Sequence, residues 1–251
     1  MQVDVVILNW LRPDHLQSYL IPTLLTCPEV GRIIISHGRR DTYFDYPDAR
    51  VISLDHSGLN EALGLALRFH CHSEVRTEAA LILDDDLFIE PAHVAQLVAS
   101  YRAKPGHIHG YDARYVMRAR DGLIYTRMRR FWRHLGDPVY LRHLLFGRPQ
   151  PVITLTKSLV APTSAMAAFM EQRHLVEDFV RERSRPFWNG EDIVMNLIHV
   201  ARTGRLPVIL KPCRPRRQTK QSKAGISSAK GHYRYRSELV RIAAEKLGLT
   251  F

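Results

Sequence analysis

Short apolar runs alternate with helix-like stretches through the first part of the chain, and this alternation restricts the fold more than any other feature. Four runs are typical of buried strands: residues 3–8, 32–36, 51–54 and 79–83. Helices are expected at 13 to about 27, 58–69 and 91 to about 103, where proline is well placed at two of the helix starts. The pattern predicts an α/β fold with a Rossmann-like, mostly parallel sheet flanked by helices.

The rest of the chain is less regular. Strands are expected at 108–117, 123–129, 152–160 and 206–210, and helices at 164–172, 175–183, 191–202 and 233–247. Residues 212–230 are rich in Pro, Lys, Arg, Ser and Gly, which predicts a mobile loop. These elements indicate a smaller subdomain within one domain that spans 1–251.

Three adjacent aspartates, Asp84, Asp85 and Asp86, follow the fourth apolar run. Parallel sheets bind ligands outside the carboxyl ends of their strands, so the triplet stands where a site is expected. Neighbouring carboxylates repel one another, and a hard divalent ion would gather them while still binding a diphosphate. The alternative is an exposed acidic turn that caps the next helix. An EF-hand is excluded because its loop glycine and ligand spacing do not follow.

Two further segments offer candidate chemistry. Glu191 and Asp192 follow Asn189-Gly190 at an expected helix start, where they either cap the helix or act on a sugar as a second pair of carboxylates. His232 and Arg236 begin the last helix. They either form an ordinary basic helix start or help to neutralise a leaving diphosphate, for which arginine is well shaped.

Single polar residues at other strand and helix ends are weaker candidates, and each has a structural role as its alternative. They are Asn9, Arg12, His37, Asn60 and Arg68.

The charge distribution suggests an anionic partner. Lys and Arg number 36 against 25 Asp and Glu, a net charge of +11, and residues 193–237 contain no acidic residue. The alternative is a solvated basic segment. Three cysteines without a C-x-x-C pair favour a reducing compartment. No apolar stretch is long enough to span a bilayer, so we expect a cytoplasmic protein, soluble or peripherally attached to a membrane.

Three segments together resemble the exostosin-like glycosyltransferases, the family of the C-terminal domains of heparan sulfate polymerases. They are residues 81–86 (LILDDD), 189–196 (NGEDIVMN) and 225–236, in which GISS is followed by Gly231, His232 and Arg236. The resemblance spans most of the chain, although residues 110–150 match poorly. One departure is Gly190, where the family usually has a cysteine that is thought to bridge in secreted members.

The resemblance implies a GT-A fold, a UDP-sugar donor, Mn²⁺ (or Mg²⁺) and retention of the anomeric configuration. For such an enzyme, the chain length and the basic segment predict a nucleotide-binding half at 1–105 and an acceptor and closing half at 106–251, with the basic loop at about 212–230 folding over the donor. By the same resemblance, Asp84 and Asp85 contact ribose and donor sugar, and Asp86 binds the metal. Asp192 lies at the reacting centre and Arg236 beside the diphosphate, and Arg12 and Arg68, with Asn60 as a further candidate, hold the nucleotide. From their positions in the sequence alone, Glu191 and His232 are added as catalytic candidates and Asn9 as a nucleotide-binding candidate.

The expected activity is transfer of an N-acetylhexosamine or a hexose to a hydroxyl of a glycan or glycolipid. One alternative keeps this chemistry but uses hydroxylated bases of viral DNA as the acceptor, bound through the basic stretch 193–237. A further alternative is a non-enzymatic nucleic-acid binder, which would leave the aspartate triplet without a purpose.

Overall fold

The computed structural model describes residues 1–127, 136–147, 150–183, 188–219 and 231–251. Its centre is a seven-stranded sheet in the order β11-β6-β10-β4-β1-β2-β3. The strands are β1 (Val3–Asn9), β2 (Val30–His37), β3 (Val51–Asp55), β4 (Ala79–Asp84), β6 (His109–Gly110), β10 (Ser158–Pro162) and β11 (Val208–Ile209). Four of the six ladders are parallel and the two ladders of β10 are antiparallel, which confirms the predicted mostly parallel sheet.

Two smaller sheets complete the strands. One joins β8 (Gly122–Thr126), β7 (Ala113–Ala119) and β9 (Pro151–Thr154), and the other joins β12 (Arg217–Gln218) to β5 (Leu87–Phe88). The second pairing brings a late segment of the chain against the residues that directly follow the aspartate triplet.

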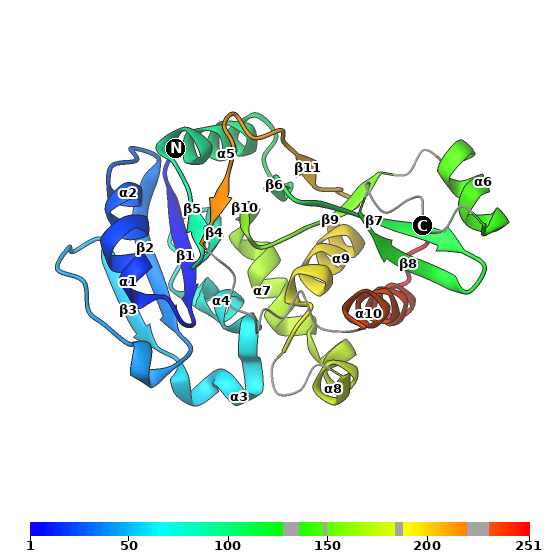
Figure 1. Ribbon diagram of the computed structural model, residues 1–251, viewed down its shortest axis with the longest axis horizontal. Helices are drawn as coiled ribbons and strands as arrows, with labels where there is room; N and C mark the ends of the chain where they lie inside the picture. The colour runs from blue at the N-terminus through cyan, green and yellow to red at the C-terminus, as the bar shows by residue number, and fades with distance from the viewer. Residues whose placement is uncertain (128–135, 148–149, 184–187, 220–230) are drawn as a thin grey trace.

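Helices cover both faces of the central sheet (Figure 1). One face packs against the π-helical η1 (Leu16–Leu20), which continues α1 (Pro13–His15), and against α2 (Ile21–Leu25) and α5 (Pro91–Ala103). The other packs against α4 (Leu67–His70) and α7 (Thr163–Gln172). Farther from the sheet, α9 (Glu191–Thr203) packs against α7 and β9, and α10 (His232–Lys246) packs against β8, α9 and α8 (His174–Arg183). Alternate residues of β1 enter the two cores, Val6 one and Ile7 the other, which explains its unbroken apolar sequence.

The remaining elements are short apart from α6 (Pro138–Phe146). They are η2 (Arg40–Thr42), η3 (Ser57–Leu59), α3 (Asn60–Leu63), η4 (Gly64–Ala66) and η5 (Cys71–Ser73). Among the helices that the model describes, none is long and apolar enough to cross a membrane.

Several expected elements are divided in the structure. The helix expected at 58–69 breaks at Gly64, whose φ of 49° is open to glycine but unfavourable for other residues. The strand expected at 152–160 becomes β9 and β10, because the Asn196 side chain bonds both the N–H and the carbonyl of Thr154. The strand expected at 108–117 likewise divides into β6 and β7.

The loop expected at 212–230 contains the short strand β12, and its residues 220–230 lie outside the described residues. The strand expected to continue to 129 ends at Thr126, beyond which the described residues reach only 127. The expected helices at 91–103, 164–172, 175–183, 191–202 and 233–247 are confirmed to within about one residue at each end.

Candidate active site

The carboxyl edge of the central sheet gathers the first candidate residues. The parallel register places Leu8 beside Asp84 and Asn9 beside His37. Asn9 donates from Nδ2 to the carbonyl of Thr42 at 2.8 Å, and the same atom lies 2.9 Å from Nδ1 of His37. Asn9 therefore ties the ends of β1 and β2 to the loop that follows them.

The three aspartates do not meet at one point, because each has a different partner. Asp84 pairs with Nη1 of Arg68 at 2.6 Å. Asp85 is buried, pairs with Nη1 of Arg12 at 2.7 Å and accepts from the N–H of Trp10 at 3.0 Å. Only the carboxylate of Asp86 forms no ion pair with any residue that the structure describes. The expectation that one ion gathers all three carboxylates is not met by this arrangement.

Asp86 is the member of the triplet best suited to a metal. Its Oδ1 accepts from Nε2 of Gln218 at 3.2 Å, and its backbone carbonyl accepts from the N–H of Thr219 at 2.8 Å. Burial and the nearby charge of Asp84 raise the pKa of Asp86. A cation would relieve both effects.

The described residues contain no group of three or more His, Cys, Asp or Glu side chains that could hold a metal by themselves. An ion here would therefore share its coordination between Asp86, water and a bound diphosphate, as Mg²⁺ often does.

Arg68 connects the triplet to the start of α9. This arginine is buried, donates to Asp84 through Nη1 at 2.6 Å, and approaches Oε1 of Glu191 with Nε at 3.9 Å. Glu191 also accepts from Oγ1 of Thr156 at 3.4 Å and from the Gly190 N–H at 3.1 Å. Burial and the neighbouring charge of Asp192 raise the pKa of Glu191 to about 7.

Asp192 is held by Arg236, which reaches it from α10. Nη1 of Arg236 donates to Oδ2 of Asp192 and to the hydroxyl of Tyr125, each at 3.0 Å, and Nη2 donates to Oδ1 of Asn189 at 3.2 Å. These negative and polar partners raise the pKa of Arg236 despite its burial, so it stays charged. The structure thus brings the predicted Asp192 and Arg236 into direct contact.

His232 is the first residue of α10 and lies one helical turn before Arg236. Its burial and the nearby positive charge of Arg236 lower its pKa to about 4, so the imidazole is neutral at pH 7. It is therefore available as a hydrogen-bonding group and not as a cation.

The position of Asn60 in the structure gives the least support for a functional role among the candidate residues. It is half-buried at the first position of α3, and its Oδ1 has no partner in the described part of the chain.

Several residues around the site had no signal in the sequence. Gln218 reaches Asp86 only because β12 pairs with β5, and Tyr125 reaches Arg236 from the β7–β8 hairpin. Arg114 lies buried in β7, in the region where the sequence pattern was poorest. The contacts of Gln218 and Tyr125 join residues 132 and 111 positions apart, which no local motif reveals.

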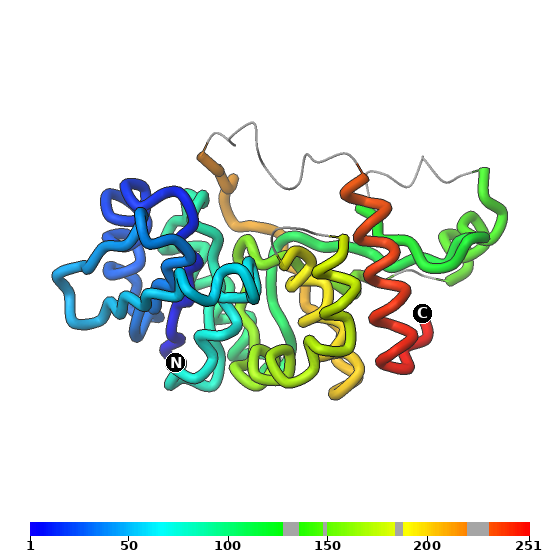
Figure 2. The backbone as a smooth tube through the Cα atoms, turned by 90° about the horizontal axis from the view of Figure 1, so that it is seen from below, coloured from blue at the N-terminus to red at the C-terminus, as the bar shows by residue number. Residues whose placement is uncertain are grey.

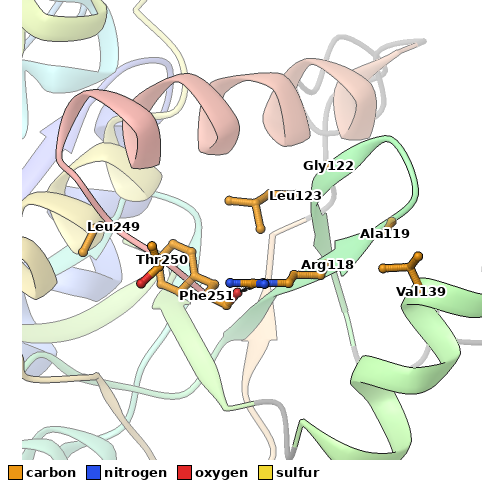
Figure 3. A pocket seen from close by; sticks show the side chains of 8 residues that line it. All are labelled: Arg118, Ala119, Gly122, Leu123, Val139, Leu249, Thr250 and Phe251. Carbon is orange, nitrogen blue, oxygen red and sulfur yellow. Dashed lines mark hydrogen bonds between the residues drawn. The ribbon is translucent and has the colours of Figure 1, made fainter.

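Two cavities lie outside this network. One, of about 310 Å³, is bounded by the β7–β8 hairpin, α6 and residues 249–251, and Arg118 donates there to the carbonyl of Phe251 (Figure 3). The other, of about 490 Å³, lies beside β5 and is lined by Tyr19, Phe88 and Arg214 among others. Neither is lined by a candidate residue, so the polar network defines the site better than these cavities do.

The seven-stranded, mostly parallel central sheet with an aspartate cluster at its carboxyl edge has the GT-A fold of its solved structural neighbours. The chain belongs to the glycosyl transferase family 64 domain family, whose model matches residues 5–249.

Solved structures agree with this fold. Glucosyl-3-phosphoglycerate synthase from Mycobacterium tuberculosis, crystallised with Mn²⁺, UDP and glucosyl-3-phosphoglycerate, matches with a TM-score of 0.54 and 14% identity over 100% of this chain and 81% of that one. The same enzyme with Mn²⁺, UDP-glucose and phosphoglyceric acid matches with a TM-score of 0.51 and 15% identity over the same shares of the two chains. No curated protein matches this chain in sequence.

Proposed function

We propose that this protein is a metal-dependent, retaining glycosyltransferase that moves a hexose or an N-acetylhexosamine from a UDP-sugar to a hydroxyl of a glycan or glycolipid. Its family membership supports the transfer of a sugar. The complexes of its structural neighbours with Mn²⁺ and UDP-glucose support the donor and the metal. The resemblance of residues 81–86, 189–196 and 225–236 to exostosin-like enzymes supports the retaining outcome.

One observation carries the proposal. A continuous polar path runs from Asp84 through Arg68 to Glu191 and, by way of the adjacent Asp192, to Arg236. It joins the sheet edge where nucleotides bind in α/β folds to a second pair of carboxylates. A nucleotide-sugar enzyme needs this juxtaposition, because the diphosphate and the anomeric carbon must be handled at the same time.

On the donor side, Asp86 would hold the metal, which when bound would stabilise the negative charge of the departing UDP. Asp85 is occupied by donors of the protein itself, so it would fix the loop of Arg12 against the nucleotide rather than bind sugar directly. Asp84 retains partial exposure, and its side chain would bind ribose or sugar hydroxyls while Arg68 orients it. Asn9 and Asn60 remain candidates for polar contacts to the nucleotide.

On the reacting side, the charge of Asp192 would stabilise positive charge that develops at the anomeric carbon. Arg236 orients Asp192 and adds positive charge toward the leaving diphosphate. Neutral His232 would accept or donate a hydrogen bond at the rim of the same site. The raised pKa of Glu191 suits it to a neutral, hydrogen-bonding state near pH 7.

The test is release of UDP from a panel of UDP-sugars, with and without Mn²⁺ and in the absence of acceptor. We expect slow Mn²⁺-dependent hydrolysis of one donor, reduced about 100-fold or more in Asp86→Asn. Asp178→Asn, on the exposed face of α8, is the matched control and should retain the full rate. The absence of both hydrolysis and Mn²⁺-dependent UDP binding in the wild type would contradict the proposal.

The nucleic-acid acceptor is less well supported, because several cations of the acid-free stretch have partners. Arg202 pairs with Glu171 at 3.0 Å, Arg214 with Glu90 at 2.8 Å, and Arg216 with Asp112 at 2.8 Å. A gel shift with duplex DNA at increasing salt tests the alternative, since phosphate contacts give steeply salt-dependent binding.

A further inference from the structure

Lys157 is a cation beside the aspartate triplet that bonds a neutral amide. It directly precedes β10, and its backbone carbonyl accepts from the N–H of Asp84 at 3.0 Å. Its side chain is half-buried, and Nζ donates to Oε1 of Gln218 at 3.1 Å. Among the described residues, its ammonium group forms no ion pair with a carboxylate. The role of Lys157 therefore depends on what Gln218 does.

Gln218 connects this ammonium group to Asp86. It lies in β12, where it pairs with Leu87 of β5, and its Nε2 donates to Oδ1 of Asp86 at 3.2 Å. The N–H of the next residue, Thr219, donates to the backbone carbonyl of Asp86 at 2.8 Å. Both views of the chain show β12, coloured orange, beside the teal β5 (Figures 1 and 2). The side chain and the backbone of Asp86 are thus both held by this late segment.

The amide of Gln218 fits between these two groups in only one orientation. An ammonium group only donates hydrogen bonds, and an ionised carboxylate only accepts them. The oxygen of the amide must therefore face Lys157 and its nitrogen must face Asp86, as the two contacts show. Without a donor at position 157, the amide could turn over and direct its oxygen at the Asp86 carboxylate, which would repel it.

The bond from Gln218 fixes the direction of the Asp86 carboxylate. It occupies Oδ1, and no donor of the described residues bonds Oδ2. Hydrogen bonds to a metal ligand orient it and tighten metal binding. This orientation matters here because Asp84 and Asp85 have arginine partners, so that Asp86 is the carboxylate of the triplet left for an ion.

We infer that Lys157 and Gln218 are positioning residues of the metal site, in which Lys157 fixes the amide of Gln218 and Gln218 orients Asp86 for the ion. The inference rests on the proposed function, in which Asp86 holds the metal. It assigns a role to two residues outside the three sequence motifs. The competing role for Lys157 is a direct contact with the diphosphate of the donor, and the two roles predict different binding data.

The test measures UDP binding by calorimetry in Mn²⁺ and in EDTA. Its readout is the factor by which Mn²⁺ tightens UDP binding, and Asp86→Asn should abolish this factor. Lys157→Met should reduce it about 10-fold, the usual effect of removing a hydrogen-bonding partner behind a metal ligand, and leave the UDP affinity in EDTA unchanged. Lys157→Arg keeps a cation that only donates, so it should retain the wild-type factor.

A double variant shows whether the two residues act in one chain. Gln218→Met should reduce the factor at least as much as Lys157→Met. Adding Lys157→Met to Gln218→Met should cause no further loss, because Lys157 acts only through the amide. Lys104→Met, exposed directly after α5, is the matched control and should keep the wild-type factor. Urea unfolding without ligands checks that each variant is folded.

The outcomes separate this inference from the proposed function. Equal losses of UDP affinity in Mn²⁺ and in EDTA for Lys157→Met would indicate direct contact with the diphosphate and overturn the inference. A wild-type factor in Lys157→Met, or additive effects of the two substitutions, would also overturn it and leave the proposed function standing. If UDP binds the wild type no more tightly in Mn²⁺ than in EDTA, the proposed metal site is contradicted and the inference with it.

Discussion

Two adjacent buried carboxyls, Glu191 and Asp192, compete for the cations around them. Asp192 has the closer partner, Arg236 at 3.0 Å, and also accepts from the N–H of Ile193 at 2.9 Å. The ion pair of Glu191 in the described part of the chain is the longer one with Arg68, at 3.9 Å. When two buried acids interact, the one with weaker stabilisation takes up the proton first. We therefore expect Glu191 to take up a proton near neutral pH.

This assignment predicts a pH-dependent stability. The pKa of Glu191 is raised from 4.5 to about 7 on folding, so its contribution is fully present below pH 4.5 and is lost as the pH rises through about 7. Glu191→Gln cannot titrate. Between pH 5 and pH 8 the wild type should lose on the order of 2 kcal/mol more unfolding free energy than the variant.

Urea unfolding at both pH values measures the difference, and titrating groups that do not interact with Glu191 cancel between the two proteins. If the unfolding free energies of the wild type and of Glu191→Gln change in parallel between pH 5 and pH 8, Glu191 is ionised over this range.

Arg236 binds three partners that the single ammonium group of a lysine could not reach together. Its two terminal nitrogens donate hydrogen bonds to Asp192, Tyr125 and Asn189. Arg236→Lys should lower the kcat of sugar transfer or donor hydrolysis about 10-fold to 100-fold, because the Asp192 carboxylate loses its orientation. Arg234→Lys, on an exposed position of the same helix, should leave kcat unchanged. Equal rates for the two variants would exclude Arg236 from the reaction.

At the scale of the element, α9 begins and ends on glycines in the left-handed region. Gly190 has φ 105° and Gly204 has φ 69°. A Cβ added at Gly190 would lie 2.4 Å from Cδ2 of Leu239 in α10, whereas one at Gly204 would meet nothing within 4 Å. Leu239 is fully buried, so it has no free space to move into. The lack of a side chain at Gly190 therefore allows α10 to lie against the start of α9.

Alanine at these two positions separates backbone strain from crowding. Gly204→Ala should cost about 1 kcal/mol, the usual penalty of a left-handed alanine. Gly190→Ala should cost about 1–3 kcal/mol more, because Leu239 and the end of α10 must shift. Chemical denaturation of both variants measures these losses of unfolding free energy. Equal losses would mean that α10 shifts away from the added Cβ at position 190 without further loss of stability.

The elements that could be predicted are those whose signal is local. Continuous apolar runs predicted β1 and β4, and proline at its start together with helical periodicity predicted α5. The break at Gly64 and the division between β9 and β10 could not be predicted in the same way. Both depend on a distant partner or on a backbone conformation that composition does not reveal.

The residues of the candidate site also differ in whether a local signal could predict them. Local motifs predicted Asp84 to Asp86, Glu191 and Asp192, and in the structure Arg68 lies between these two groups. Arg114 and Tyr125 come from a hairpin without any motif, and only the fold brings them near Arg236. The roles of all these residues in binding and catalysis remain predictions.

At the scale of the whole molecule, the two halves of the chain share one sheet and one core. Beyond β4 the sheet continues with β10, β6 and β11, all from the second half. The larger apolar core likewise contains Val6 and Ile82 together with Phe169, Ile193 and Leu239. The ion pair between Arg68 and Glu191 also crosses from one half to the other.

This interleaving predicts a single cooperative unfolding transition, in which neither half is stable alone. Trp10 follows β1 and Trp188 lies buried before α9, so each reports on a different half. Two variants, each retaining one of these tryptophans and carrying phenylalanine at the other two tryptophan positions, should unfold in urea with coincident midpoints and slopes. The ladder of β4 with β10 enforces this, because unfolding of the second half would uncover the whole edge of β4. Separate midpoints would instead show that residues 1–105 form an independent nucleotide-binding unit.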